Sequence, residues 1–173
     1  MTRINALTLD QAPAAARSAL QGVEKGLGFI PNAFATLAHS PAALAGYLAL
    51  SQALNKNSLS PAEREVAALA ASAVNGCDYC IAAHSFFGEK AGLDAGALLA
   101  ARAGTLDGVA AFARAVTLSR GQVSEVQLAA AREAGLDDTK IVDVIAQVSL
   151  LTLTNYLNNV AMTDIDFPPT DNQ

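Results

Sequence analysis

The sequence contains few charged residues and no cluster of basic ones. Charged side chains make up 16% of its 173 residues, and the formal net charge is −5. The 11 lysines and arginines are scattered singly along the chain. Proteins that bind nucleic acid or anionic lipid surfaces need a concentrated basic patch. We therefore expect neither nucleic acid nor a membrane among the partners of this chain.

Long apolar segments are missing as well. The most apolar stretch, residues 141–153, contains Asp143 and Gln147 and is too short to span a bilayer. The first ten residues hold no apolar run of the length found in signal peptides. From these two absences we expect a cytoplasmic protein.

Alternation of apolar and polar residues, which marks β-strands, is not found in the sequence. Hydrophobic residues make up 52% of the chain, and much of this excess is alanine, a strong helix former. We therefore predict an all-α fold, a compact multi-helix bundle in a single domain over residues 1–173 with its core at about 25–165. The low share of charge leaves apolar surface that a second subunit can cover, so we also expect a homo-oligomer.

Capping residues and prolines predict where the helices begin and end. Ser60 with Glu63, and Ser124 with Gln127, have the spacing of capping boxes. The tail 167–173 contains two prolines and should be loose. The expected helices cover residues 10–25, 32–39, 41–55, 61–75, 77–89, 94–103, 107–119, 124–135 and 138–162.

The chain has only two cysteines, and they stand close together. Cys77 and Cys80 are separated by two residues, and His84 follows one helical turn later. On a helix, residues three or four positions apart share a face, so the two sulfurs and the imidazole lie together. In a reducing compartment, cysteines at this spacing are more often catalytic or metal-binding than joined in a permanent disulfide.

The pair has the parts that thiol chemistry requires. The thiolate is the nucleophile, and a free cysteine with a pKa near 8.5 is mostly protonated. A helix start, a partner cysteine and an imidazole each favour the thiolate. After attack on a peroxide the sulfur becomes a sulfenic acid, which the second cysteine converts to a disulfide. The nearby His84 favours Cys80 as the attacking residue, whereas Cys77, nearer the helix start, is expected to be more exposed.

These residues resemble a known family. The motif consists of a glutamate, eleven further residues, Cys-x-x-Cys, three further residues and a histidine. This pattern resembles the alkylhydroperoxidase D-like branch of the carboxymuconolactone decarboxylase superfamily. Glu65, Cys77, Cys80 and His84 fall on this pattern. The resemblance covers residues 25–169 in general character, and its specific motif covers residues 65–84. Two further segments look like those of peroxidase-related members of this family, namely Phe29-Ile30-Pro31-Asn32 and Asp166-Phe167-Pro168.

The resemblance implies an all-helical trimer or hexamer that reduces hydroperoxides with a thiol pair. It implies Cys80 as the peroxidatic cysteine, Cys77 as the resolving one, and His84 as a proton relay with Glu65 behind it. A dithiol of unknown identity would restore the thiols, and no metal or organic cofactor is implied. One position departs from the pattern, because Tyr79 stands where the best-studied type has a histidine, and tyrosine is a far weaker base near neutrality.

Three other interpretations of the motif stay open. Cys77, Cys80, His84 and His39 would suffice for a zinc-stabilised Cys2His2 binding module. A lactone enzyme of the carboxymuconolactone decarboxylase type would not need paired cysteines. Two buried, inert cysteines are the third interpretation, since free cysteine is a common core residue.

Polar residues outside the motif have no settled role at this point. Tyr79 suits a pocket wall as well as an interface. Asn155, Asn158 and Asn159 follow one another on the predicted last helix. Their amides suit hydrogen bonding near the site as well as capping or an interface.

Overall fold

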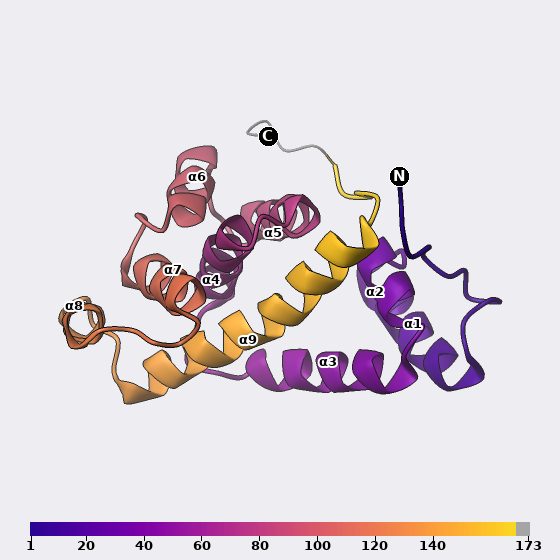
Figure 1. Ribbon diagram of the computed structural model, residues 1–173, viewed down its shortest axis with the longest axis horizontal. Helices are drawn as coiled ribbons and strands as arrows, with labels where there is room; N and C mark the ends of the chain where they lie inside the picture. Colours follow the sequence, from indigo (N-terminus) through magenta and orange to yellow (C-terminus); the bar gives the residue numbers. More distant parts are fainter. Residues whose placement is uncertain (169–173) are drawn as a thin grey trace.

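The computed structural model describes residues 1–168, and all of the regular structure in them is helical (Figure 1). This confirms the predicted all-α fold. Of the tail predicted to be loose, residues 169–173 lie outside the described residues. The helices are α1 (Ala14–Leu27), α2 (Asn32–Leu37), α3 (Pro41–Leu54), α4 (Pro61–Val74), α5 (Asp78–Lys90), α6 (Ala95–Ala103), α7 (Gly108–Ser119), α8 (Glu125–Glu133) and α9 (Asp138–Ala161).

The helix starts follow the capping residues. Ser60 and Glu63 exchange hydrogen bonds at the start of α4, and Ser124 and Gln127 do the same at the start of α8. Both predicted capping boxes are therefore confirmed. Only the first helix begins noticeably later than predicted, at residue 14 rather than 10. The reason is Pro13, which has no N–H to donate and disfavours a helical conformation in the residue before it.

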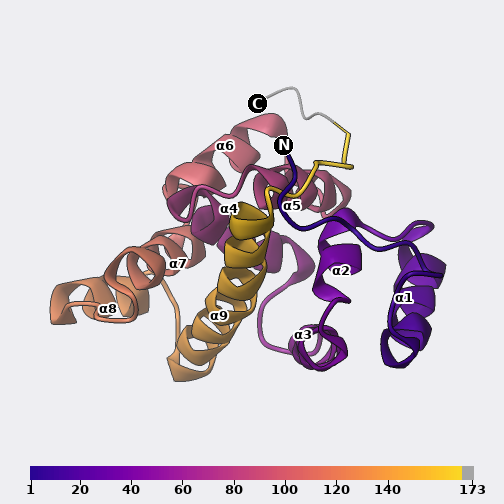
Figure 2. The same ribbon diagram turned by 45° about the vertical axis from the view of Figure 1, so that its right-hand side comes forward.

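Helix α9 is the longest helix and lies across the molecule (Figure 1). Helices α4, α5 and α7 pack against one side of it, and α2 and α3 pack against the other. Helix α4 also contacts α6, while α1 packs on α3 and α8 on α7. Figure 2 shows α9 between these two groups of helices. A side chain on α9 can therefore reach residues that are far away in the sequence.

The centre of the bundle is built from small side chains. In α4 every residue from Val66 to Ser72 is buried, and the run includes Ala67, Ala68, Ala70 and Ala71. Alanine has a short side chain, so neighbouring helix backbones can approach α4 closely on several sides. The high alanine content thus serves packing as well as helix formation.

The surface of α9 keeps an apolar stripe. Val142, Ile145, Leu153, Tyr156 and Val160 are exposed, and their spacing places them on one face. The predicted homo-oligomer stays a prediction, and this stripe is where a second subunit would bury the most apolar surface. Among residues 1–168, no helix is both long enough and apolar enough to span a membrane.

A pair of glycine substitutions tests the tight packing of α7 on α8. A Cβ atom on Gly108 would lie 2.6 Å from the Cβ of Ala134, whereas a Cβ on the exposed Gly22 of α1 would meet nothing within 4 Å. Gly108→Ala should lower the free energy of unfolding by about 1–3 kcal/mol through overpacking. Gly22→Ala should raise it by about 0.5–1 kcal/mol, since alanine favours the helix. Urea denaturation measures both, and shifts of the same sign would contradict this packing.

Candidate active site

Cys77 ends the turn between α4 and α5. Gly76 has φ of 62°, a left-handed conformation that suits glycine, and it turns the chain. The N–H of Cys77 then donates to the carbonyl oxygen of Ser72 at 3.0 Å. As the N-cap of α5, the Cys77 sulfur accepts a hydrogen bond from the backbone N–H of Cys80 at 3.3 Å. The first turn of α5 thus holds both cysteines, on one face as predicted.

Both cysteines are free thiols and both are buried. The expectation that Cys77 is the more exposed is wrong, because none of its surface reaches solvent, against 3% for Cys80. The capping role explains this, since it turns the Cys77 side chain toward the N–H groups of α5. Cys77 also packs in an apolar cluster with Tyr79 and Phe167. Cys80 lines a cavity, so its sulfur is the one that a small molecule can meet.

The two thiols differ strongly in acidity. A hydrogen bond from the Cys77 side chain is the main cause that lowers the pKa of Cys80 to about 6; burial opposes it, and His84 and Asn158 lower it further. The interaction with Cys80, followed by burial, raises the pKa of Cys77 well above its ordinary value. Near neutral pH, Cys80 is therefore the thiolate and Cys77 its hydrogen-bond donor.

His84 and Glu65 form a pair across two helices. Nδ1 of His84, on α5, lies 2.7 Å from Oε2 of Glu65, on α4. Burial alone would lower the pKa of His84, but the charge of Glu65 and the hydrogen bond to it outweigh burial and raise the pKa. Because Nδ1 is occupied by Glu65, Nε2 is the ring nitrogen that remains for the cavity. The structure thus brings together the two residues that the motif pairs.

Asparagines of α9 connect the cysteines to the core. Nδ2 of Asn158 donates to Sγ of Cys80 at 3.3 Å. One turn earlier, Asn155 donates to the Ser72 hydroxyl at 3.1 Å and accepts from Nδ2 of Asn75 at 2.8 Å. These bonds fix α9 against the turn that carries the cysteines. Of the roles left open for the asparagines, hydrogen bonding near the site is the one that Asn158 adopts.

Tyr79 is turned away from the reacting sulfur. Its hydroxyl donates to Oδ1 of Asp166 at 2.7 Å and accepts from the N–H of Ala33 at 3.2 Å. Oδ2 of Asp166 in turn accepts from the N–H of Asn32 at 2.7 Å. Burial is the main cause that raises the pKa of Tyr79, so the hydroxyl stays protonated. Tyr79 anchors the segment after α9 and takes no part as a base.

Phe167 covers the site from the anchored segment. Its ring lies 5.7 Å from Phe29, Tyr79 and Phe87 and 5.8 Å from Phe86, measured between ring centroids. Edge-to-face and tilted contacts of this kind stabilise aromatic clusters. The hydrogen bonds of Asp166 hold the neighbouring residue, so they also hold the Phe167 ring over the cavity.

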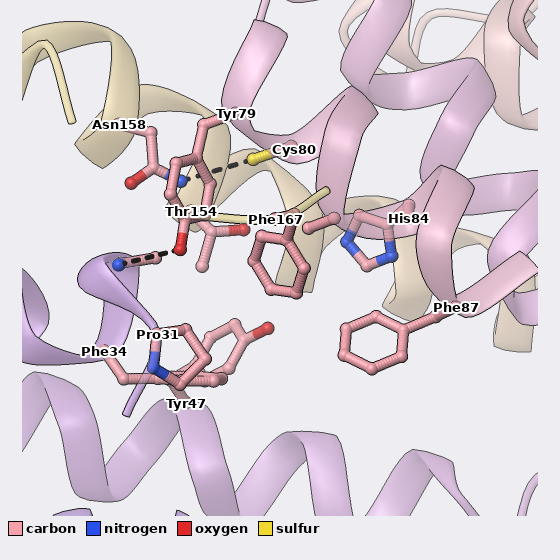
Figure 3. A pocket seen from close by; sticks show the side chains of 12 residues that line it. Pro31, Phe34, Tyr47, Tyr79, Cys80, His84, Phe87, Thr154, Asn158 and Phe167 are labelled. Carbon is pink, nitrogen blue, oxygen red and sulfur yellow. Dashed lines mark hydrogen bonds between the residues drawn. The ribbon is translucent and has the colours of Figure 1, made fainter. Parts of the chain in front are cut away.

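A cavity of about 70 Å³ opens beside the Cys80 sulfur (Figure 3). Polar groups reach it from Cys80, His84, Tyr47, Thr154 and Asn158, and most of the remaining wall is apolar. The apolar wall consists of Pro31, Ala33, Phe34, Ala83, Phe87 and Phe167, and Tyr79 also lines the cavity.

Sequence reasoning missed two polar residues of this cavity. Tyr47 comes from α3 and Thr154 from α9, so neither lies near the motif in the sequence. Tyr47 carries the only polar tip in the apolar run 42–50, and that is the signal that points to it. Thr154 offers no comparable signal.

The zinc interpretation finds no support in the geometry. His39, the fourth ligand it requires, follows α2, and its Nε2 lies 3.0 Å from the carbonyl oxygen of Asn5. In residues 1–168, no three His, Cys, Asp or Glu side chains gather as a metal site would need.

The acidity of Cys80 predicts a pH profile for alkylation. The rate with iodoacetamide should rise with pH around a midpoint near 6 and level off above it, because only the thiolate reacts. The measurement is the rate of adduct formation by mass spectrometry across the pH range. Cys77→Ala should move the midpoint upward, because it removes the side-chain hydrogen bond that lowers the pKa of Cys80 most.

The matched control is Cys80→Ser, which leaves only Cys77. Its alkylation should stay slow through neutral pH, because the Cys77 sulfur is fully buried and burial still raises its pKa when Cys80 is absent. A faster reaction at Cys77 than at Cys80 would reverse the assignment of the two thiols.

Comparison with known proteins finds similar sequences and folds. Residues 41–120 match the carboxymuconolactone decarboxylase family. A peroxidase-related protein from Ralstonia eutropha JMP134, an alkylhydroperoxidase AhpD core, has a similar structure, with a TM-score of 0.81 and 28% sequence identity over 98% of this chain and 93% of the other. No curated protein matches the sequence closely enough to count as a relative.

Two further solved structures share the fold. A peroxidase-related protein from Silicibacter sp. TM1040 has a TM-score of 0.76 and 22% identity, over 93% of this chain and 91% of the other. The debrominase Bmp8 has a TM-score of 0.79 and 18% identity, over 96% of this chain and 93% of the other.

The matched segment 41–120 contains the whole motif from Glu65 to His84. The helices before and after it have the arrangement seen in the AhpD-like structures. Over residues 41–120 the chain is therefore similar to the carboxymuconolactone decarboxylase family, and over nearly its whole length it has the AhpD-like fold.

Proposed function

We propose that this protein reduces hydroperoxides with the Cys80–Cys77 pair and is restored by a dithiol. The observation that carries the proposal is the lowered pKa of a buried thiol that lines a cavity together with His84. A resolving thiol lies in the same helical turn, and His84, which is paired with Glu65, borders the same cavity. These are the parts that a peroxide-reducing thiol pair needs.

The reaction begins at the Cys80 thiolate. Its electron pair attacks the terminal oxygen of the hydroperoxide ROOH, so that an S–O bond forms and the O–O bond breaks. The products are a sulfenic acid on Cys80 and the alkoxide RO⁻. The protonated His84 ring, held by Glu65, supplies the proton that converts the alkoxide to the alcohol ROH.

The second half of the reaction closes and reopens a disulfide. The Cys77 thiol attacks the sulfenic acid, a disulfide forms, and the hydroxyl leaves with a proton as water. An external dithiol then reduces the disulfide and is itself oxidised to a disulfide. In sum, ROOH and a dithiol give ROH, water and the oxidised dithiol, and His84 regains its proton from solvent.

The cavity favours organic hydroperoxides. Phe34, Phe87 and Phe167 supply apolar walls that suit a hydrocarbon group better than water. The few polar groups gather near the Cys80 sulfur, where the O–O group would lie. An alkyl or aryl hydroperoxide fits this arrangement, because its hydrocarbon group would contact the apolar walls and its O–O group would lie beside the polar groups.

Reductive dehalogenation is a second candidate. The debrominase Bmp8 has the same fold, and its C82A variant has been seen with 2,3,4-tribromopyrrole. The aromatic walls of the Cys80 cavity would also accept a flat halogenated ring. Two thiols would replace carbon-bound bromine with hydrogen and yield a disulfide and bromide, which uses the same cysteine pair. A lactone enzyme, in contrast, would keep full activity in Cys80→Ser.

A thiol titration tests the proposed function. One equivalent of cumene hydroperoxide should remove both free thiols from the wild type, because the sulfenic acid is resolved by Cys77. Cys77→Ser should retain a sulfenic acid that dimedone traps, and Cys80→Ser should not react. Intact thiols in the wild type would overturn hydroperoxide reduction, and loss of thiols with 2,3,4-tribromopyrrole alone would favour the second candidate.

The Glu65 charge predicts how activity depends on pH. The pKa of His84 is raised by Glu65, so its cationic form persists to higher pH than in an unpaired histidine and is lost as pH rises through the raised value. Glu65→Gln should lower that pKa and move the alkaline fall of the hydroperoxide rate to lower pH. At the pH where the wild type is most active, the rate of hydroperoxide reduction in Glu65→Gln should be about 10²-fold lower. Glu89→Gln, at an exposed position of α5, the helix that carries His84, is the control. An unchanged profile in Glu65→Gln would contradict the relay.

A further inference from the structure

Tyr47 stands at the junction of two cavities. It lines the Cys80 cavity, and it also lines an adjoining cavity of about 300 Å³ whose wall includes Glu65 and His84. Figure 3 shows its hydroxyl pointing into the space that His84, Phe87 and Phe167 surround. The phenol group therefore faces the reacting centre from α3, opposite the helix that carries the cysteines.

The ring of Tyr47 is held by packing. It contacts the Phe34 ring, with 5.6 Å between the ring centroids and 56° between the ring planes. It also packs against the apolar core that α4 and α9 share. A side chain held in this way presents its hydroxyl in a fixed direction, which a hydrogen-bond donor to a reacting atom requires.

The surroundings keep the Tyr47 hydroxyl protonated. Burial is the main cause that raises its pKa, and the charges of Cys80 and Glu65 raise it further; the Thr154 hydroxyl has a smaller, opposite effect. Negative charge on two sides disfavours a tyrosinate. Tyr47 thus remains a neutral O–H donor near neutral pH, where Cys80 is a thiolate.

The other polar groups of the cavity are largely committed. The Thr154 hydroxyl donates to the carbonyl oxygen of Leu151 at 3.1 Å, and Nδ2 of Asn158 donates to the Cys80 sulfur. The Tyr79 hydroxyl donates to Asp166. Nε2 of His84 and the Tyr47 hydroxyl, which neighbours the Thr154 hydroxyl, are then the donors best placed for a bound molecule.

We propose that Tyr47 is a further catalytic residue, whose hydroxyl donates a hydrogen bond to the hydroperoxide oxygen that leaves when the O–O bond breaks. The inference rests on the proposed hydroperoxide reduction. As the Cys80 sulfur bonds to the terminal oxygen, the O–O electron pair moves onto the oxygen that carries R. Tyr47 stabilises this growing charge and keeps its own proton, while His84 delivers the proton that forms the alcohol.

The test compares Tyr47→Phe with Tyr156→Phe, which removes the same hydroxyl from an exposed position on α9. Stopped-flow kinetics give the rate at which Cys80 reacts with cumene hydroperoxide, and iodoacetamide gives the rate of the same thiolate with a reagent whose leaving iodide needs no hydrogen bond. Both rates are proportional to the fraction of Cys80 present as thiolate, so this fraction cancels in the ratio of the two rates. Tyr47→Phe should lower this ratio by about tenfold or more, and Tyr156→Phe should leave it unchanged.

A second substrate separates catalysis from a general structural effect. Peracetic acid releases acetate, a weakly basic leaving group that needs little stabilisation, whereas cumene hydroperoxide releases a strongly basic alkoxide. The loss in Tyr47→Phe should therefore be much smaller with peracetic acid. Equal losses with both oxidants, or an unchanged ratio, would overturn the role of Tyr47. A wild type that reacts with iodoacetamide but with neither oxidant would overturn the proposed function itself, and this inference with it.

Discussion

The hydrogen bond from the Cys80 N–H to the Cys77 sulfur is the contact on which the site depends. It makes Cys77 the N-cap of α5, so the cysteine that begins the helix also places the second cysteine one turn away. Because capping turns Cys77 inward, only Cys80 borders the cavity. This local bond thus decides which thiol is accessible, while the hydrogen bond from the Cys77 side chain to the Cys80 sulfur makes Cys80 the more acidic one. Accessibility and acidity together assign the roles of the two thiols.

The remaining parts of the site are brought to this turn by packing between distant segments. Helix α4 presents Glu65 to His84, α9 presents Asn158 to Cys80, and α3 presents Tyr47 to the cavity. The small side chains in α4 allow the helices to approach closely enough for these contacts. The segment after α9 closes the cavity with Phe167, held in place through Asp166 and Tyr79. The helical bundle thereby holds together the small, mostly apolar cavity beside Cys80.

The sequence predicts what local physics determines. Helix starts follow from Ser60 and Ser124, because a capping side chain acts within three residues. The shared face of the cysteines follows from helical spacing. Contacts across the fold do not follow from the sequence. Neither the position of Thr154 in the cavity nor the bond between Asn158 and Cys80, 78 residues apart, has a local pattern that reveals it. The burial of Cys77 was also mispredicted, since its exposure depends on which way the capping side chain turns.

The central claim is that Cys80 and Cys77 can be joined and separated reversibly by substrate and dithiol. Peptide mapping by mass spectrometry after treatment with cumene hydroperoxide tests this most directly. The account predicts that the peptide carrying both cysteines loses two hydrogens and regains them with dithiothreitol. A peptide that gains oxygen on Cys80 without forming the disulfide, or one that is unchanged, would contradict it.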